Sequence, residues 1–300
     1  MTLLPELCRS GYATANGVRL HYVEAGSGPL VLLLHGFPQF WYAWKHQLPA
    51  LARAGYRAVA VDLRGYNLSS RPAGVDAYDL DTLSDDVAAL VVALGEGSAA
   101  LVGHDWGAAV AWRTAARHPG RVSRLAILNG VHPRAFVREL RNPAQLLRSA
   151  YVLFFQLPVV PELVLRARDH ALIERVLRRD ARPGAFTDAD VEAHKAALRQ
   201  PGALTAALNY YRAAARHARR LTRPAETRVE QPVLLIWGDR DRYLAPGLAR
   251  GLERWVSRIR VEHLPEATHW VMAEEPARVS ELLVGFLREG RWGDAAAATA

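Results

Sequence analysis

Short runs of aliphatic residues recur along the chain, and stretches with helical periodicity separate them. The runs are Leu30–Leu34, Ala58–Val61, Ala100–Val102, Leu125–Leu128 and Val233–Trp237. Continuous apolar runs of this length are typical of parallel strands that are buried on both faces. Because helical stretches such as Leu80–Leu94 and Gly107–Arg117 lie between the runs, the pattern predicts an α/β fold in which helices cover both faces of a mostly parallel sheet.

A β-hairpin is predicted at the start of this sheet, between Tyr12 and Ala25. Two strand-like runs flank the dipeptide Asn16-Gly17. This dipeptide accepts positive φ at both central positions of a type I′ turn. We therefore expect the two runs to pair as antiparallel strands.

A helical insertion is predicted in the second half of the chain. The strand pattern stops near Pro133 and resumes only at Val233. We expect a cap at residues 133–223, inserted into a core formed by residues 1–132 and 224–300.

Three helices are predicted inside this cap. Asn142 and Pro143 have the residue types of an N-cap and a first helical position, with Gln145 placed to complete a capping box. One face of this helix should carry Leu147, Tyr151, Phe154 and Phe155. Thr187 should cap the second helix. The third follows Pro201-Gly202 and should carry the stripe Leu204, Leu208 and Tyr211. Tyr210 lies about 100° away and is expected to face neither the core side nor the pocket.

Composition narrows the classes of partner. The net charge is +8, but the basic residues are almost all arginines interleaved with carboxylates, so we expect no nucleic-acid partner. No run reaches the roughly 18 apolar residues of a membrane span, and residues 1–12 lack the charged start of a signal peptide, so a cytoplasmic protein is expected. Cys8 is the only cysteine, which excludes thiolate metal clusters. No metal or organic cofactor is implied, and a homodimer stays open.

The pentapeptide Gly103-His104-Asp105-Trp106-Gly107 follows a predicted strand and opens a predicted helix. This is the context of a nucleophile elbow, whose tight turn favours flanking glycines. Asp105 occupies the position of the nucleophile. A carboxylate that attacks a saturated carbon forms an ester that water can cleave, whereas a serine would form an inert ether. The sequence therefore predicts a substrate with an electrophilic sp³ carbon, either an epoxide or an alkyl halide.

The remaining members of a catalytic triad follow in the order acid, then histidine. Asp239 and Asp241 come directly after the strand Val233–Trp237, and His269 lies in a later loop. Either aspartate could be the acid on this evidence. Upstream, Phe37 follows the strand Leu30–Leu34, so the backbone N–H groups of Phe37 and Trp106 are the expected oxyanion hole.

The leaving group separates the two kinds of substrate. An epoxide oxygen needs O–H donors, whereas a halide is satisfied by indole or amide N–H groups. Tyr151 and Tyr211 lie on the apolar stripes of their cap helices, so both hydroxyls are expected beneath the cap, in the pocket. These two tyrosines favour a small apolar epoxide.

Five motifs in register resemble the α/β-hydrolase-fold epoxide hydrolases, from about Tyr12 to Leu287. They are His35-Gly36-Phe37-Pro38, Asp62-Leu63-Arg64-Gly65-Tyr66, Gly103-His104-Asp105-Trp106-Gly107, Tyr151-Val152-Leu153-Phe154-Phe155-Gln156 and Leu208-Asn209-Tyr210-Tyr211-Arg212. The resemblance implies that Tyr151 and Tyr211 polarise the epoxide while Asp105 attacks. It also implies that Asp241, rather than Asp239, supports His269 in activating water. The chain departs from many members at Ala108 and Asn67, where glycine is common.

Four other functions are weighed against this one. A haloalkane dehalogenase typically has a second halide donor, either asparagine at the position of Phe37 or a tryptophan in the cap, and residues 133–223 contain no tryptophan. A fluoroacetate dehalogenase needs an arginine where this chain has Trp106, and its acid position is occupied by Asn129. An ester hydrolase would need Ser or Cys in place of Asp105. A non-catalytic hydrolase-fold receptor would not need the complete triad.

Overall fold

A single eight-stranded sheet forms the centre of the molecule. The computed structural model describes residues 7–218 and 227–289. The strands are β1 (Cys8–Ala15), β2 (Val18–Ala25), β3 (Leu30–Leu34), β4 (Arg57–Val61), β5 (Ala99–His104), β6 (Val122–Leu128), β7 (Val233–Gly238) and β8 (Ile259–Leu264). Their order is β1-β2-β4-β3-β5-β6-β7-β8. β2 pairs antiparallel with β1 and with β4, and β3 to β8 run parallel.

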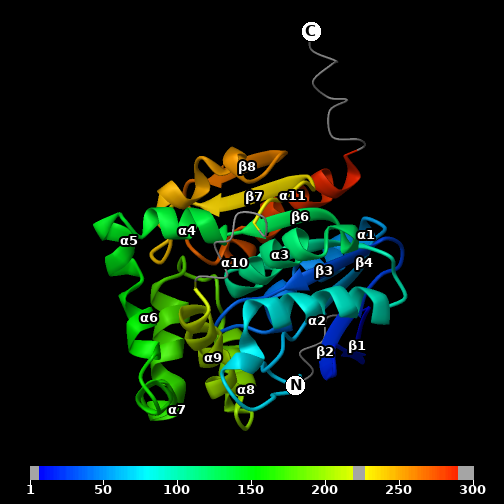
Figure 1. Cartoon of the computed structure of the whole chain (residues 1–300). Helices are drawn as coiled ribbons and strands as arrows, with labels where there is room; N and C mark the ends of the chain where they lie inside the picture. Colours follow the sequence, from blue (N-terminus) through cyan, green and yellow to red (C-terminus); the bar gives the residue numbers. More distant parts are fainter. Residues whose placement is uncertain (1–6, 219–226, 290–300) are drawn as a thin grey trace.

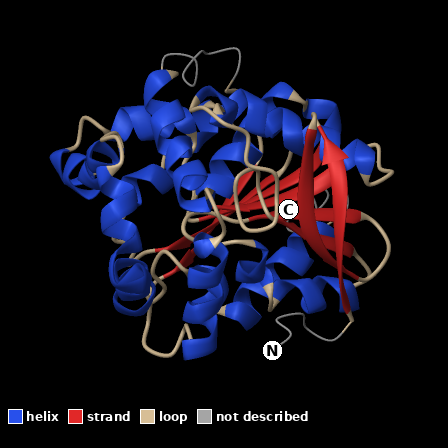
Figure 2. Cartoon of the chain, turned by 90° about the horizontal axis from the view of Figure 1, so that it is seen from below, coloured by secondary structure: helices blue, strands red, loops and turns tan. Residues whose placement is uncertain are grey.

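Helices cover both faces of this sheet (Figures 1 and 2). Those outside the insertion are α1 (Gln47–Arg53), α2 (Leu80–Ala93), α3 (Trp106–Arg117), α10 (Val271–Glu274) and α11 (Pro276–Arg288). Side chains alternate along β3 between the two faces. Leu32 and Leu34 pack in the core that contains residues of α2 and α3, whereas Val31 and Leu33 pack in the core that contains residues of α1 and α11. Burial on both faces explains why this strand has no polar position.

The predicted strands and hairpin are confirmed. Each of the five aliphatic runs lies in a strand, and Asn16 and Gly17 have φ values of 47° and 74° between β1 and β2. Strand β8 was not predicted from the sequence. It lies at the edge of the sheet, where its residues are only partly buried and do not form an apolar run.

The segment between β6 and β7 is helical, as predicted. It contains α4 (Pro133–Glu139), α5 (Pro143–Arg148), α6 (Ala150–Phe155), α7 (Val160–Arg179), α8 (Asp188–Arg199) and α9 (Ala203–Arg216). In Figure 1, α5 to α9 lie together at one end of the molecule. The predicted end of the cap at residue 223 lies outside the described residues. None of the helices described is both long and apolar enough to cross a membrane.

The first predicted cap helix is interrupted. α5 ends at Arg148 and α6 begins at Ala150. The predicted common face is therefore wrong for Leu147, which is 79% exposed. Asn142 does accept a hydrogen bond from the Ala144 N–H, but the Gln145 side chain completes no capping box and bonds instead to the Ser149 hydroxyl and to the backbone of the β7–β8 loop.

The other two cap predictions agree with the structure. Thr187 and Asp190 form a reciprocal capping box at the start of α8. The stripe Leu204, Leu208 and Tyr211 on α9 is buried. Helix α7 contains an irregularity that its sequence did not reveal, because Arg168, Asp169 and His170 have positive φ and separate two helical segments.

Candidate active site

Asp105 lies at the sharp turn between β5 and α3. Its φ and ψ are 51° and −118°, a region that L residues rarely adopt. The neighbouring glycines make the turn possible. A Cβ on Gly107 would lie 2.1 Å from the Leu34 carbonyl oxygen, and one on Gly103 would lie 2.5 Å from the Gly107 carbonyl oxygen. The turn therefore directs the Asp105 side chain away from the sheet and into a cavity.

The two oxygens of the Asp105 carboxylate have different surroundings. Oδ1 accepts a hydrogen bond of 2.8 Å from the Phe37 backbone N–H. Oδ2 lies 3.6 Å from Nε2 of His269. Gly36 allows this approach, because a Cβ there would lie 2.3 Å from the Asp105 side chain. A backbone hydrogen bond thus fixes Oδ1, whereas Oδ2 faces His269.

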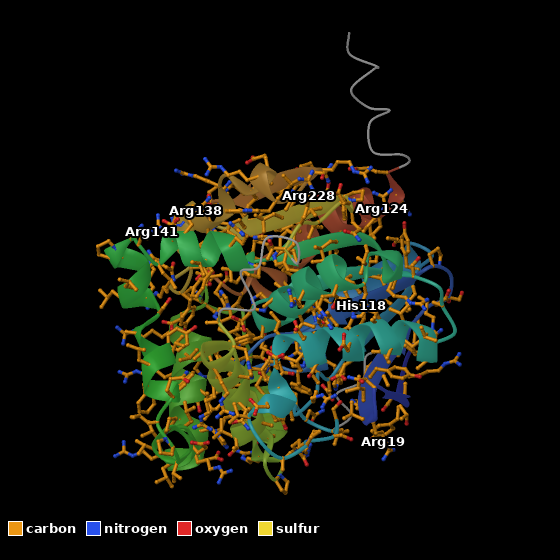
Figure 3. The ribbon with its side chains drawn as sticks, in the orientation of Figure 1. Arg19, His118, Arg124, Arg138, Arg141 and Arg228 are labelled. Atoms are coloured by element: carbon orange, nitrogen blue, oxygen red, sulfur yellow. The ribbon has the colours of Figure 1, made fainter. Side chains whose placement is uncertain are left out.

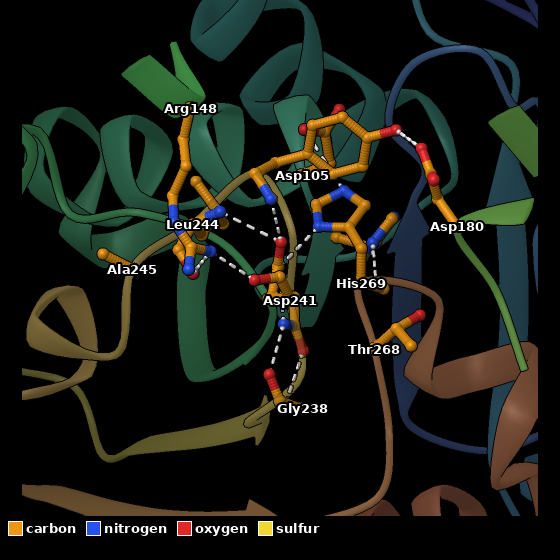
Figure 4. Close-up of polar contacts among 12 residues, drawn as sticks. Asp105, Arg148, Asp180, Gly238, Asp241, Leu244, Ala245, Thr268 and His269 are labelled. Atoms are coloured by element: carbon orange, nitrogen blue, oxygen red, sulfur yellow. Dashed lines mark hydrogen bonds and ion pairs between the residues drawn. The ribbon is translucent and has the colours of Figure 1, made fainter. Parts of the chain in front are cut away.

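Asp241 is the carboxylate that contacts His269. Its Oδ2 accepts a 2.7 Å hydrogen bond from Nδ1 of His269 (Figure 4). The same oxygen accepts a 2.7 Å bond from the Asn129 amide, and Oδ1 accepts bonds from the backbone N–H groups of Tyr243 and Leu244 at 2.7 and 3.0 Å. These donors keep the buried carboxylate ionised and fix its orientation.

Asp239, the rival acid, has another partner. Its Oδ1 lies 2.6 Å from Nδ1 of His263, on the more exposed side of the β7–β8 region. The geometry therefore separates the two aspartates, and only Asp241 hydrogen-bonds to His269.

Electrostatics favour an imidazolium between two carboxylates. Burial alone would lower the pKa of His269, but the Asp241 and Asp105 charges outweigh it and raise that pKa from 6.5 to about 10. Burial would likewise raise the pKa of Asp105, yet the hydrogen bond and charge of His269 hold it below its ordinary value. The resting site thus contains ionised Asp105 and Asp241 with protonated His269.

Two buried histidines support the loops around the site. His35 accepts a 3.1 Å bond from the Leu63 N–H at Nε2, so its Nδ1 donates to the Gly36 carbonyl. His104 lies 2.9 Å from the His269 carbonyl oxygen through Nε2. Burial lowers the pKa of His104 to about 3, so the ring is neutral and donates at this nitrogen.

Tyr151 and Tyr211 come together opposite Asp105, as predicted. Their ring centroids are 5.9 Å apart, and their side chains hydrogen-bond to each other. The Trp106 side chain hydrogen-bonds to Tyr211, with ring centroids 4.9 Å apart. Burial raises the pKa of both tyrosine hydroxyls, so both remain protonated donors through neutral pH.

Tyr210 lies outside the cavity, as predicted, but the expectation that it would not face a core is wrong. It is fully buried, and its hydroxyl donates a 2.7 Å bond to the Arg64 carbonyl. Its ring packs against Tyr66 and Tyr78. Helix α9 therefore buries two faces, one toward the cap and one toward the main core.

A cavity of about 320 Å³ connects these groups. It is lined by Phe37, Pro38, Asp105, Tyr151, Phe154, Phe155, Leu165, Leu172, Ile173, Val176, Asp180, Tyr211, Tyr243, His269 and Trp270. Most of this wall is apolar or aromatic, and most of the apolar part comes from α6 and α7. Cap and core residues thus build the cavity together.

Three polar residues near the triad were not identified from the sequence as partners of the site. Asn129 binds Asp241 as described above. The Tyr243 hydroxyl donates a 2.6 Å bond to Oδ2 of Asp180, at the end of α7, and the Tyr243 ring lies 5.2 Å from that of His269. These contacts join residues far apart in the chain, so no local motif could reveal them.

Comparison with known proteins gives the family. A model described as alpha/beta hydrolase fold matches residues 29–276. The chain is 43% identical over 281 residues to AB hydrolase superfamily protein YfhM of Bacillus subtilis, covering 92% of this chain and 97% of that protein. It is 39% identical over 285 residues to Epoxide hydrolase 3 of Xenopus tropicalis, covering 91% and 76%. A crystal structure of the Bacillus megaterium epoxide hydrolase in complex with an inhibitor aligns with a TM-score of 0.84 at 35% identity, over 93% of this chain and 100% of that one.

The chain belongs to the α/β-hydrolase-fold epoxide hydrolases. The predicted fold and the predicted family are therefore confirmed. A second solved member of this family, epoxide hydrolase A from Mycobacterium thermoresistibile, aligns with a TM-score of 0.81 at 32% identity over 94% of this chain and 98% of that one. Agreement over nearly the whole chain means that the family assignment covers both the sheet and the helical insertion.

Proposed function

We propose that this protein adds water to an epoxide and releases a vicinal diol, through an alkyl-enzyme ester on Asp105. The observation that carries the proposal is the placement of an aspartate, rather than a serine, at the elbow. Its carboxylate lies between the Phe37 N–H and His269, in the cavity that Tyr151 and Tyr211 also line. An aspartate is the nucleophile suited to a saturated carbon, because its ester can be hydrolysed.

The first step forms the ester. Asp105 attacks an epoxide carbon with Oδ2, because Oδ1 is held by the Phe37 N–H. The carbon–oxygen bond of the ring breaks, and the oxygen that leaves accepts a proton from the Tyr151–Tyr211 pair. Trp106 and Tyr211 both direct hydrogen bonds along this pair toward Tyr151. The Tyr151 hydroxyl is therefore the donor best placed to serve the substrate.

The second step hydrolyses the ester. His269 passes the proton of its resting imidazolium to the tyrosinate left by the first step. As the neutral base, it then takes a proton from water, and the water oxygen attacks Cγ of Asp105. Negative charge develops on Oδ1, to which the Phe37 backbone N–H already donates. The backbone N–H of Trp106 supplies the second donor. Collapse of this intermediate breaks the bond to the substrate and releases the diol. The second proton of the water goes to the leaving diol oxygen and His269 keeps the first, so the site returns to ionised Asp105, neutral tyrosines and an imidazolium that Asp241 stabilises.

The cavity supports a small apolar epoxide as substrate. Apart from the triad and the two tyrosines, its polar lining consists of Asp180 and Tyr243, which bond to each other. We assign most of the apolar wall to a cap at residues 133–223 and the triad to a core of residues 1–132 and 224–300. The cap thus supplies most of the apolar wall and the two tyrosine donors, and the core supplies the nucleophile and the base.

The halide alternative is weaker on the same geometry. The indole N–H of Trp106 is engaged with Tyr211, and Phe37 offers a phenyl ring where a halide-binding asparagine would be needed. Acidic O–H groups, rather than free N–H groups, therefore face the substrate. Donors of this kind suit an alkoxide better than a halide.

The test is to trap the ester. His269→Gln should be alkylated once by styrene oxide and not regenerate, so mass spectrometry should find the adduct on the peptide that contains Asp105. Asp105→Asn is the matched control and should show neither adduct nor turnover. An unmodified Asp105 peptide after long incubation of His269→Gln would contradict the covalent route.

A second measurement tests the leaving group. Purified protein should form diol from styrene oxide and release no bromide from 1-bromobutane. Tyr151→Phe and Tyr211→Phe should each lower the rate of diol formation by about 10²-fold, the usual size of general acid assistance. Bromide release without diol would identify a dehalogenase instead, and normal rates in both variants would remove the tyrosines from the mechanism.

A further inference from the structure

Most of the exposed large hydrophobic side chains in the described parts of the chain gather on the cap. We call the following set the apolar edge: Leu146, Leu147, Leu153, Leu157, Val159, Val160, Leu163 and Val164, which are 42–79% exposed. They belong to α5, α6, the start of α7 and the turn before it, which form one outer edge of the molecule in Figure 1. Exposed apolar surfaces of this extent usually mark a binding site.

The start of α7 has an apolar face on its solvent-exposed side. Val160, Leu163 and Val164 are exposed, whereas the polar Glu162 between them is buried and bonds to Arg212. Positions i, i+3 and i+4 share one face of a helix. An apolar face that points to solvent gains nothing from the fold itself, so it indicates contact with something outside this chain.

The charges around the apolar edge are uncompensated and basic. Within the described residues, no ion pair is formed by the exposed arginines Arg141, Arg166, Arg168, Arg175 and Arg179. By contrast, all four carboxylates between residues 141 and 180 already have arginine partners. These pairs are Glu162–Arg212, Asp169–Arg199, Glu174–Arg178 and Asp180–Arg242. Arg141 extends outward beside α5 in Figure 3.

We propose that the apolar edge docks on the surface of a bilayer that contains anionic lipids. Helices that lie in a membrane interface combine exposed leucine or valine with arginine or lysine, and anionic headgroups attract each basic residue. A second copy of the chain is a poorer occupant. A twofold interface on this patch would gather the unpaired arginines of both copies in one contact, whereas the four carboxylates between residues 141 and 180 already have arginine partners.

The position of the cavity gives this docking a consequence. Leu165 and Leu172 of α7 line the cavity, and Leu165 lies directly after the exposed pair Leu163 and Val164. An apolar substrate dissolved in the acyl region would therefore be concentrated beside the helix that forms the cavity wall. Binding to lipid goes beyond the proposed function and does not depend on it, because it can be measured without turnover.

The experiment is co-sedimentation of the full chain with vesicles. Phosphatidylcholine vesicles are compared with vesicles that also contain phosphatidylglycerol. The wild type should bind the second kind more tightly, and added salt should weaken this binding. Arg141→Glu/Arg166→Glu should bind at least about 25-fold more weakly, since each basic residue near an anionic surface contributes roughly fivefold. Leu153→Ser/Leu163→Ser should bind at least about tenfold more weakly, since it removes two apolar side chains that the bilayer would bury.

Matched controls come from the other parts of the surface. Val92 is 51% exposed on α2, and Arg53 is exposed at the end of α1, so Val92→Ser and Arg53→Glu should bind vesicles as the wild type does. All variants should keep the wild-type unfolding temperature within a few degrees. The proposal is overturned by equal binding to both kinds of vesicle, by no binding, by equal losses in the controls, or by a stable dimer in sedimentation velocity that the Leu153→Ser/Leu163→Ser variant abolishes.

Discussion

The two half-reactions of the proposed mechanism are expected to differ in their pH dependence, because alkylation would remove the charge of Asp105. In the free protein, His269 has a pKa of about 10 in place of 6.5, which corresponds to about 5 kcal/mol in favour of the imidazolium. Asp105 contributes to this as one of two carboxylates beside the ring. Once Asp105 is an ester, only Asp241 remains to hold the proton.

The size of the change follows from the distance between the groups. Nε2 of His269 lies 3.6 Å from Oδ2 of Asp105. At an effective dielectric constant of about 20, this separation corresponds to about 5 kcal/mol, or a little over three pH units. The protonation midpoint of His269 in the alkylated protein should therefore lie about three pH units below that in the free protein. Formation of the ester thus converts His269 into a base that works near neutral pH.

Stopped-flow single turnovers can separate the steps, with Trp106 as a fluorescent reporter because its ring contacts Tyr211. The pKa of Asp105 is below its ordinary value, so its reactive ionised form persists until the pH falls into the acid range. Alkylation should therefore be constant across neutral pH. Ester hydrolysis should become faster as the pH rises through the lowered midpoint of His269. Identical pH profiles for the two steps, or hydrolysis that accelerates as the pH falls, would refute the reasoning.

Two further variants test how the site is held. Tyr243→Phe keeps the ring beside His269 but removes the 2.6 Å hydrogen bond to Asp180. Thermal unfolding should show that the free energy of unfolding falls by about 1–2 kcal/mol, and KM should rise. An unchanged unfolding temperature would show that this bond does not hold the cap. Gly36→Ala would place a Cβ 2.3 Å from the Asp105 side chain, so kcat/KM should fall by about 10²-fold or more. Gly97→Ala is its control, because nothing lies within 4 Å of a Cβ there, and equal activity of the two variants would contradict the steric argument.

The parts of the fold that could be predicted are those in which local pattern and burial coincide. Strand β3 is covered on both faces, so its sequence is continuously apolar. The edge strand β8 is only half buried and carries no such signal. The turn at Asp105 was predictable because steric crowding requires Gly103 and Gly107 on either side of Asp105.

Other features depend on contacts that the chain makes at a distance. A single helical period was assumed through Ser149, and the break there directs Leu147 outward. Tyr210 is buried because α9 lies between the cap and the main core and presents apolar groups to both. The choice of Asp241 over Asp239 rested on resemblance alone, and the hydrogen bond from Asn129 that fixes Asp241 has no signature in spacing.

The backbone at Asp105 has a consequence for how this protein tolerates change. Its φ of 51° is a conformation that costs a non-glycine residue of order 1–3 kcal/mol. That cost is sustained by the packing of β5 and α3, in particular by the close approach of Gly107 to Leu34. The turn is thus a strained conformation that the surrounding core packing holds in place. Substitutions that loosen this packing should let the turn relax, so that the Asp105 carboxylate leaves its position before the protein unfolds. Activity should therefore fall at a lower level of destabilisation than the level that unfolds the protein.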